Sequence, residues 1–280
     1  MKKRILLIGL IFIYFFNCDT KKSQSPDQFR SQLLCYVGGV CPTQRGVKYG
    51  ILGDSWTDLA LGVPLIETMR VQLEKHYQYK MVGSTLAGQT MKRIYDSGTH
   101  IRIIDEAGPD IKYMLLSLGG NDIQGSVSEY AGRVAAEKQE RLTLVRNTLL
   151  DMIHTGNIYK VQKHGGAPLT WIIYGYDYSN PDIPSLGGST GCRATLQDAG
   201  LTDPEIQSLV VDGLNEYNNL LRDLTTQETQ LRYIDLRGTL GGNPSAAGHM
   251  WDCIHPNSGG FSLLAKRYVS VLEGYTNYEK

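Results

Sequence analysis

Two short polar segments, far apart in the chain, carry a serine, an aspartate and a histidine that could act together. Ser55 stands in the segment Gly-Asp-Ser-Trp, and Asp252 and His255 lie three residues apart near the C-terminus. A serine becomes a nucleophile when a base takes its proton, and an imidazole can accept that proton and pass it to a leaving alcohol. The aspartate would fix the tautomer of the imidazole and stabilise its charged form. This combination predicts acyl transfer from an ester.

Acyl transfer also needs hydrogen-bond donors for the negative charge that develops on the carbonyl oxygen. The backbone N–H groups of Ser55 and Gly88 and the side-chain amide of Asn121 could supply three such donors. We therefore predict an oxyanion hole formed by Ser55, Gly88 and Asn121.

Five predicted strands alternate with five predicted helices along the chain. The strands are short apolar runs at residues 47–52, 79–82, 111–118, 169–176 and 231–236. The helices are longer stretches at residues 59–76, 90–107, 127–161, 203–224 and 261–272. Asp203 is the expected N-cap of the fourth helix, with Pro204 at its first position. This alternation predicts an α/β fold, with three α/β/α layers and a flavodoxin-like, doubly wound sheet of five parallel strands, and we expect a single domain over residues 46–280.

Ligand sites in such sheets lie outside the carboxyl ends of the strands. Ser55 follows the first predicted strand, Gly88 the second and Asn121 the third, while Asp252 and His255 lie in a loop after the fifth. We therefore expect these residues to meet at one edge of the sheet.

Four segments around these residues, GDSW, AGQT, GGND and DCIHPN, resemble in order the four functional blocks of the SGNH (GDSL-type) hydrolases. The resemblance spans roughly residues 47–272. It implies the SGNH hydrolase fold and a serine esterase that works through an acyl-serine intermediate, without a metal or an organic cofactor. By this likeness the nucleophile is Ser55, the oxyanion donors are Ser55, Gly88 and Asn121, and the Asp/His pair is Asp252 and His255.

Two positions depart from the family pattern. Trp56 stands where an aliphatic residue often follows the serine, and Gly83 replaces an asparagine that is common five residues before the glycine of the second block. Neither change removes a catalytic group, but Trp56 could narrow or reshape the acyl pocket.

A second serine offers an alternative nucleophile. Ser189 lies in a Gly-x-Ser-x-Gly pattern, which in α/β-hydrolases joins a buried strand to a helix. Here the flanking residues are typical of a loop, so we favour Ser55. A different class of function is a surface-displayed binding module that keeps the fold without catalysis, although such a module has no need for Ser55, Asp252 and His255 together.

The N-terminus resembles the signal peptide of a bacterial lipoprotein. Three basic residues precede an apolar run that ends at Cys18, and the run is too short to span a bilayer. We predict a signal peptide over residues 1–18 with lipidation of Cys18, a tether over residues 19–45, and a location in the cell envelope or outside the cell. An ordinary secreted protein and an uncleaved N-terminal anchor are the alternatives.

The five cysteines leave an even number once Cys18 is assigned to lipid. Cys35 and Cys41 could close a short loop, and Cys192 and Cys253 are then the other candidate pair. Four free thiols are the alternative. No cysteine or histidine cluster has zinc spacing, so we expect no structural metal.

The overall composition limits the partners. The 28 basic and 28 acidic residues balance, so the chain has no net charge to draw it onto nucleic acid. We expect an ester substrate, with O-acyl or O-acetyl esters of glycans preferred and lysophospholipids as the alternative. The preference for glycans rests on a site held at the envelope surface and on Tyr174, Tyr176 and Tyr178, whose rings could face the site or simply pack. The sequence predicts no oligomeric state.

Overall fold

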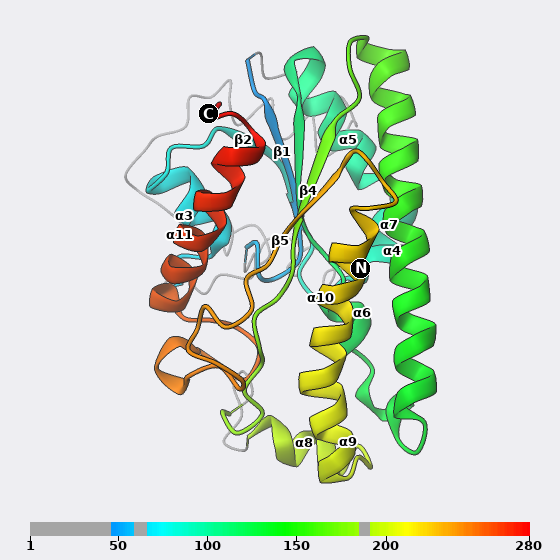
Figure 1. The fold of residues 1–280 in the computed structure, drawn as a ribbon, viewed down its shortest axis with the longest axis vertical. Coiled ribbons are helices and arrows are strands. Elements are labelled where there is room, and N and C mark those ends of the chain that lie inside the picture. Colours follow the sequence, from blue (N-terminus) through cyan, green and yellow to red (C-terminus); the bar gives the residue numbers. More distant parts are fainter. Residues whose placement is uncertain (1–45, 59–65, 185–190) are drawn as a thin grey trace, which may run out of the picture. The chain divides into compact units, whose positions relative to one another are not determined.

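Five parallel strands form the central sheet of the computed structural model, in the order β2-β1-β3-β4-β5 (Figure 1). Their bounds are β1 Tyr49–Gly53, β2 Met81–Thr85, β3 Tyr113–Ser117, β4 Thr170–Tyr174 and β5 Leu231–Ile234. Every residue of β1 and β3 is buried, as expected for parallel strands that are covered on both faces. The predicted doubly wound sheet of five parallel strands is confirmed.

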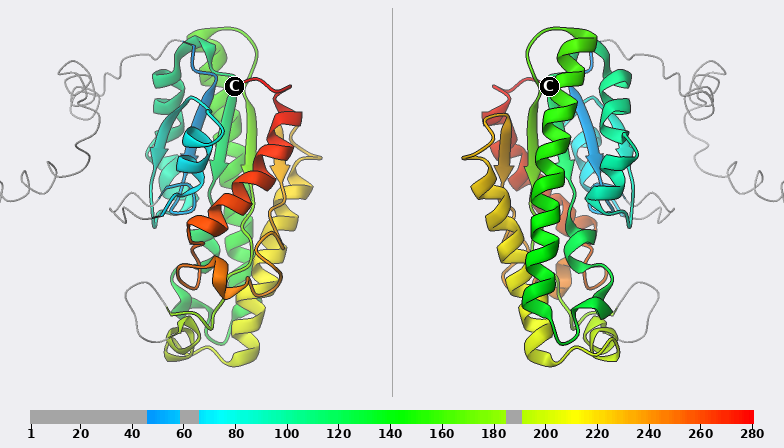
Figure 2. Two further views of the ribbon diagram at one scale, coloured as in Figure 1. Left: turned by 90° about the vertical axis from the view of Figure 1, so that its left-hand side faces the viewer. Right: turned by 90° about the vertical axis from the view of Figure 1, so that its right-hand side faces the viewer.

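Helices cover both faces of this sheet (Figures 1 and 2). On one face lie α3 Met69–Lys75 and α11 Ser258–Tyr275. On the other face lie α4 Met91–Asp96, α5 Thr99–Ala107, α7 Val134–His164 and α10 Gly213–Leu224. The sheet and its two helical layers are the expected α/β/α arrangement.

Shorter helical elements connect these layers. The short α-helices are α6 Gly120–Gln124, α8 Cys192–Asp198 and α9 Asp203–Gln207. The 3-10 turns are η1 Gly108–Asp110, η2 Val127–Tyr130 and η4 Ala247–His249, and η3 Ser208–Asp212 is a π-helical turn. After β4 the chain forms a group of short helical elements, α8, α9 and η3, which lie beyond the carboxyl ends of the strands (Figure 1).

The structure describes residues 46–58, 66–184 and 191–280, which belong to one compact unit over residues 43–280. Cys18, Cys35, Cys41, Ser189, the predicted signal peptide and the predicted tether lie outside the described residues. None of the helices within the described ranges is long and apolar enough to cross a membrane.

Four predicted helices differ from those observed. Within the described residues, the helix expected at residues 59–76 is α3, which begins only at Met69, and the helix expected at residues 127–161 is η2 followed by α7. The helix expected at residues 203–224 is divided into α9, η3 and α10.

The helix expected at residues 90–107 is divided into α4 and α5 at Gly98, whose left-handed φ of +67° ends the first helix. The helix expected at residues 203–224 is capped by Thr202 rather than Asp203. The Thr202 N–H donates to the carboxylate of Glu205 at 2.8 Å, and this capping-box contact starts the helix one residue earlier.

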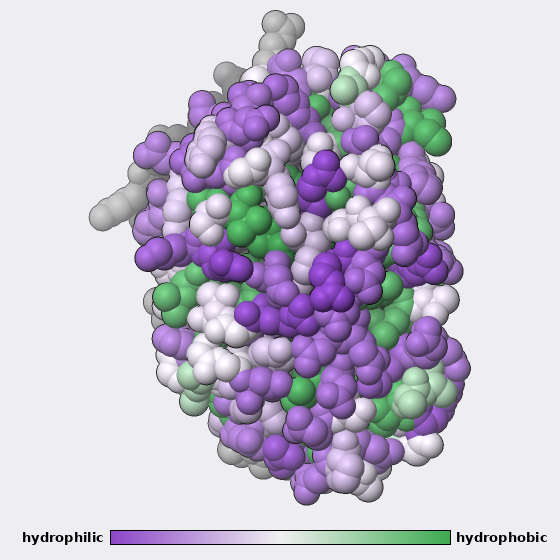
Figure 3. Space-filling view, viewed as in Figure 1, coloured by the Kyte–Doolittle hydropathy of each residue, from purple (hydrophilic) through white to green (hydrophobic). Residues whose placement is uncertain are grey.

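Among the described residues, the apolar core has two parts. The larger surrounds the sheet. The smaller, which we call the satellite cluster, lies among η2, α8, α9 and η3, and it consists of Tyr130, Val134, Leu196, Leu201, Ile206, Leu209 and Val210. On the face drawn in Figure 3, apolar residues form small separate patches among polar ones, which is ordinary for a globular domain. The satellite cluster gives the short helices a packing core of their own beyond the sheet.

Candidate active site

The segments that follow β1, β3 and β5 carry polar residues singled out in the sequence. Ser55 follows β1, Asn121 is the second residue of α6 after β3, and His255 lies in the loop between η4 and α11. These loops lie at the carboxyl edge of the sheet because all five strands are parallel.

A continuous chain of hydrogen bonds joins Ser55, His255 and Asp252. The distance from His255 Nε2 to Ser55 Oγ is 2.8 Å, and the distance from His255 Nδ1 to Asp252 Oδ2 is also 2.8 Å. The side chain of Asp252 is 3% exposed and that of His255 is 10% exposed, so little water competes for these bonds. The geometry lets the imidazole take a proton from the serine while its other nitrogen donates to a carboxylate.

The carboxylate of Asp252 also fixes the backbone of its own loop. Asp252 Oδ1 accepts hydrogen bonds from the N–H groups of Ile254 at 2.8 Å and of His255 at 2.6 Å. Burial disfavours the charged carboxylate, but these bonds and the nearby imidazole outweigh it and hold the pKa of Asp252 below its ordinary value. Asp252 therefore stays ionised beside the histidine at neutral pH.

The three expected oxyanion donors differ in how the structure presents them. Within the described ranges, the backbone N–H groups of Ser55 and Gly88 have no hydrogen-bond acceptor. Asn121 Nδ2 donates to the carbonyl of Gln89 at 3.1 Å, which orients the amide and leaves its second N–H available. Ser55 and Asn121 both line the cavity described next, whereas Gly88 is exposed and is not part of its wall.

The cavity beside Ser55 has a volume of about 70 Å³. We call it the reacting cavity, and Ser55, His255, Asn121, Trp56 and Tyr176 line it. The Trp56 ring is 5% exposed and packs edge-on against the Tyr176 ring, with 5.1 Å between ring centroids. Trp56 thus forms part of the wall next to the serine.

A family model described as GDSL-like Lipase/Acylhydrolase matches residues 43–268. The chain belongs to this family. Membership confirms the family expected from the four motifs and makes the protein a carboxylic ester hydrolase. No curated protein matches the sequence.

Solved structures of low sequence identity share the fold of this GDSL-family hydrolase. One is the lipase Lip_vut3 from a goat rumen metagenome, with 17% identity, a TM-score of 0.53, and coverage of 80% of this chain and 96% of that chain. Another is a candidate GDSL-like lipase from Parabacteroides merdae, with 12% identity, a TM-score of 0.54, and coverage of 82% of this chain and 96% of that chain. At these identities the likeness supports the fold and leaves the substrate open.

A buried pair that the sequence did not reveal, Asp54 and Tyr176, stands directly behind the serine of the GDSL-family hydrolase. Asp54 Oδ2 accepts a hydrogen bond from the Tyr176 hydroxyl, and Asp54 Oδ1 accepts one from the Trp56 N–H at 3.0 Å. Burial raises the pKa of Asp54 to about 6, although both hydrogen bonds act in the opposite direction. The only sequence signal was the adjacency of Asp54 to Ser55, which is equally typical of a turn.

The tyrosines expected near the site give different outcomes. Tyr174 is 2% exposed and packs in the core, which is the packing role considered for the tyrosines in the sequence analysis. Tyr176 is 3% exposed and is held by Asp54, so it offers no open face for a sugar. The Tyr178 hydroxyl donates to the side-chain oxygen of Asn215 at 2.8 Å. The tyrosines therefore do not support a glycan substrate.

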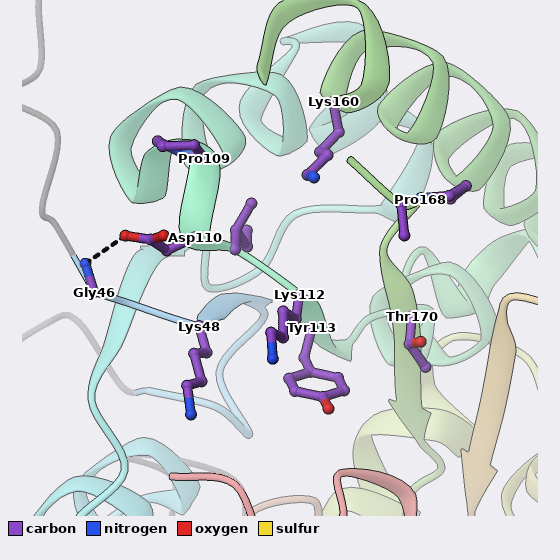
Figure 4. A pocket seen from close by; sticks show the side chains of 11 residues that line it. Gly46, Lys48, Pro109, Asp110, Lys112, Tyr113, Lys160, Pro168 and Thr170 are labelled. Carbon is purple, nitrogen blue, oxygen red and sulfur yellow. Dashed lines mark hydrogen bonds between the residues drawn. The ribbon is translucent and has the colours of Figure 1, made fainter. Parts of the chain in front are cut away.

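A larger cavity lies away from the reacting residues. It has a volume of about 580 Å³, and the residues that line it include Lys48 and Lys112 just before β1 and β3, Asp110 of η1 and Lys160 of α7 (Figure 4). Lys48 and Lys112 are paired with Glu279, and Lys160 donates to the Gly165 carbonyl. The wall of this cavity contains none of the residues expected to react, and its three lysines already have partners.

A disulfide joins Cys192, the first residue of α8, to Cys253 in the catalytic loop. One of the two candidate pairs is therefore present, while Cys35 and Cys41 lie outside the described residues. Cys253 sits between Asp252 and His255, so the crosslink restrains the segment that carries the imidazole. In the described part of the chain, no three His, Cys, Asp or Glu side chains gather as metal ligands would.

The elevated pKa of Asp54 predicts a pH-dependent stability. In the folded state the Asp54 carboxyl keeps its proton up to about pH 6, whereas an unfolded aspartate releases its proton near pH 4. The contribution of this group to the free energy of unfolding is therefore fully present below pH 4 and is lost as the pH rises through 6. Asp54→Asn does not titrate. Urea unfolding measures the effect. Relative to wild type, we expect the free energy of unfolding of the variant to be lowered by about 2 kcal/mol more at pH 4 than at pH 7.

The control for this prediction is Ser117→Ala. It removes a hydroxyl that donates to Asp54 Oδ1 at 3.4 Å but keeps the carboxyl, so its stability should follow the wild-type pH profile. A difference between Asp54→Asn and wild type that is the same at every pH would contradict the prediction.

Loss of the disulfide should affect both stability and turnover. Because the two cysteines are 61 residues apart, we expect Cys192→Ser to lower the free energy of unfolding by about 2–4 kcal/mol. We also expect kcat to fall several-fold, because the segment that carries His255 loses a restraint. Thermal unfolding and ester hydrolysis measure the two effects.

The matched controls are the Cys192→Ser/Cys253→Ser double variant and the reduced wild type, both of which should behave like the single variant. If stability and turnover are unchanged in all three, the restraint has no role.

Proposed function

We propose that this GDSL-family hydrolase cleaves esters by a double displacement in which Ser55 is the nucleophile. The observation that carries the proposal is the hydrogen-bonded chain from Ser55 Oγ through His255 to Asp252, at the wall of the reacting cavity. Ser55 Oγ attacks the ester carbonyl while His255 Nε2 takes the serine proton. Asp252, kept ionised by its hydrogen bonds, stabilises the imidazolium that forms.

In the tetrahedral intermediate the carbonyl oxygen is negative. We propose that the N–H groups of Ser55 and Gly88 and the amide of Asn121 donate to it, since the first two have no other acceptor in the described residues. The imidazolium then gives its proton to the leaving alcohol, and the acyl group remains on Ser55. Water, deprotonated by His255, attacks this acyl-serine. The bond between the acyl carbon and Ser55 Oγ breaks, His255 returns the proton to Oγ, and the carboxylic acid leaves.

We propose O-acyl esters of glycans as the substrates. Support comes from Trp251, which is partly exposed and whose ring centroid lies 6.4 Å from that of His255. The leaving alcohol must pass beside this imidazole, and an aromatic ring there offers an apolar surface to the C–H face of a sugar. Lysophospholipids are the alternative, and lipidation of Cys18, which would hold the enzyme at an envelope surface, remains part of the proposal.

Substitution of the two candidate nucleophiles tests the mechanism. We expect Ser55→Ala to lower kcat for p-nitrophenyl acetate by about a thousandfold or more and to abolish labelling by a fluorophosphonate probe. Asn121→Ala should lower kcat by about 100- to 1000-fold and still be labelled, since its nucleophile is intact.

Ser189→Ala is the matched control, and we expect it to keep both turnover and labelling. Retained turnover in Ser55→Ala together with its loss in Ser189→Ala would overturn the assignment. If the folded wild type neither reacts with the probe nor hydrolyses any ester, the protein is a binding module.

The substrate class is tested by release of the acid from xylan that carries acetyl or hexanoyl esters, beside hydrolysis of lysophosphatidylcholine. We expect the glycan to be the better substrate. Trp251→Ala should raise KM for the glycan several-fold more than KM for p-nitrophenyl acetate, because only the glycan has a sugar ring that would contact Trp251. Faster hydrolysis of the lipid, or an equal change in both KM values, would reject the glycan.

A further inference from the structure

A second hollow lies beside the reacting cavity and has no part in the steps above. We call it the apolar pocket, and it has a volume of about 170 Å³. Its walls include Leu196, Leu209 and Val210 of the satellite cluster and the disulfide Cys192–Cys253. Gln124 and Ile254 line both the apolar pocket and the reacting cavity, so the two spaces adjoin.

The pocket is formed by the short helices beyond the sheet. Leu196 comes from α8, while Leu209 and Val210 come from the π-helical turn η3. Turns of this kind are uncommon and often occur at functional sites. An open hollow with a mostly apolar lining next to a nucleophile is typical of a ligand pocket, so it is a feature to be explained.

The position of the pocket relates it to the acyl side of an ester. Asn121 and Gln124 lie three residues apart on α6, so their side chains share one face of the helix. Gln124 is held in place by donating to the Ser179 hydroxyl at 2.8 Å. An acyl chain that extends from a carbonyl held at Asn121 meets Gln124 and then the apolar pocket.

We infer that the apolar pocket binds the aliphatic chain of the substrate's acyl group, so that the preferred ester carries about four to eight acyl carbons rather than an acetyl group. This inference rests on the proposed function of Ser55. The size fits, because an apolar cavity of about 150 Å³ binds a six-carbon ring. The reacting cavity, at about 70 Å³, holds the carbonyl and its first carbons, and the alcohol leaves on the side of His255.

Chain-length profiles test the inference. Each methylene that enters the pocket should raise kcat/KM by about threefold, so we expect p-nitrophenyl hexanoate to be hydrolysed with a kcat/KM at least about tenfold above that of the acetate. Chains longer than about ten carbons should lose this gain. A flat or falling profile from acetate to hexanoate would overturn the inference.

Filling the pocket is the second arm of the experiment. Thr195 is exposed on α8 and lines the pocket, so Thr195→Phe adds a ring there with little effect on the core. We expect the ratio of hexanoate to acetate kcat/KM to fall toward one in this variant. Gln197→Phe is the matched control, because Gln197 is exposed on the same helix and lines neither space, and it should keep the wild-type ratio. Equal ratios in the two variants would contradict the inference.

A third arm separates the acyl side from the alcohol side. Alkyl acetates from ethyl to hexyl vary only the alcohol, and we expect no chain-length gain with them. A gain confined to this series would assign the pocket to the alcohol and overturn the inference. Failure of the proposed function is distinct from all these outcomes. It would appear as ester hydrolysis that persists in Ser55→Ala, or as no ester hydrolysis by the folded wild type.

Discussion

The active site of this enzyme depends on holding the imidazole of His255 between the hydroxyl of Ser55 and the carboxylate of Asp252, which come from opposite ends of the domain's sequence. Ser55 and His255 are 200 residues apart in sequence, yet Oγ and Nε2 are within 2.8 Å. A parallel sheet makes this possible because the turn after β1 and the loop that follows β5 both lie beyond the carboxyl ends of the strands. The loop itself is closed by backbone bonds from the Trp251 N–H and the Asp252 N–H to the His255 carbonyl.

Buried polar groups support this geometry from behind. Asp252 and Asp54 are each 2% exposed, and burying a carboxylate is unfavourable unless hydrogen bonds compensate. Asp252 has these bonds from its own loop and from His255, which lowers its pKa. Asp54 has them from Tyr176 and Trp56, but burial prevails and raises its pKa. The pKa values of the two aspartates near this serine are thus shifted in opposite directions, because burial outweighs the hydrogen bonds at Asp54 but not at Asp252.

The short helices beyond the sheet add a second level of organisation. They carry the satellite cluster, the disulfide to the catalytic loop and the apolar pocket. The sheet positions the reacting groups, while these helices shape the space next to them. Separation of the two tasks lets substrate preference change in the loops without disturbing the hydrogen-bonded chain at the strand ends.

The sequence alone determined the family, the succession of strands and helices along the chain and the residue types at the strand ends, because apolar periodicity and short motifs are local properties of the chain. It also narrowed the disulfide to a choice of pairs that included Cys192 and Cys253. It could not reveal that Thr202 caps α9 or that Gly98 divides a helix, because each depends on competition between local alternatives of similar energy. It could not reveal that Asp54 bonds to Tyr176 either, because these residues are far apart in sequence and meet only through the tertiary fold. The apolar pocket was equally hidden, since its walls come from five separate segments. Only packing in three dimensions decides which side chains of distant segments share a wall, and that is where the size and polarity of the substrate space were set.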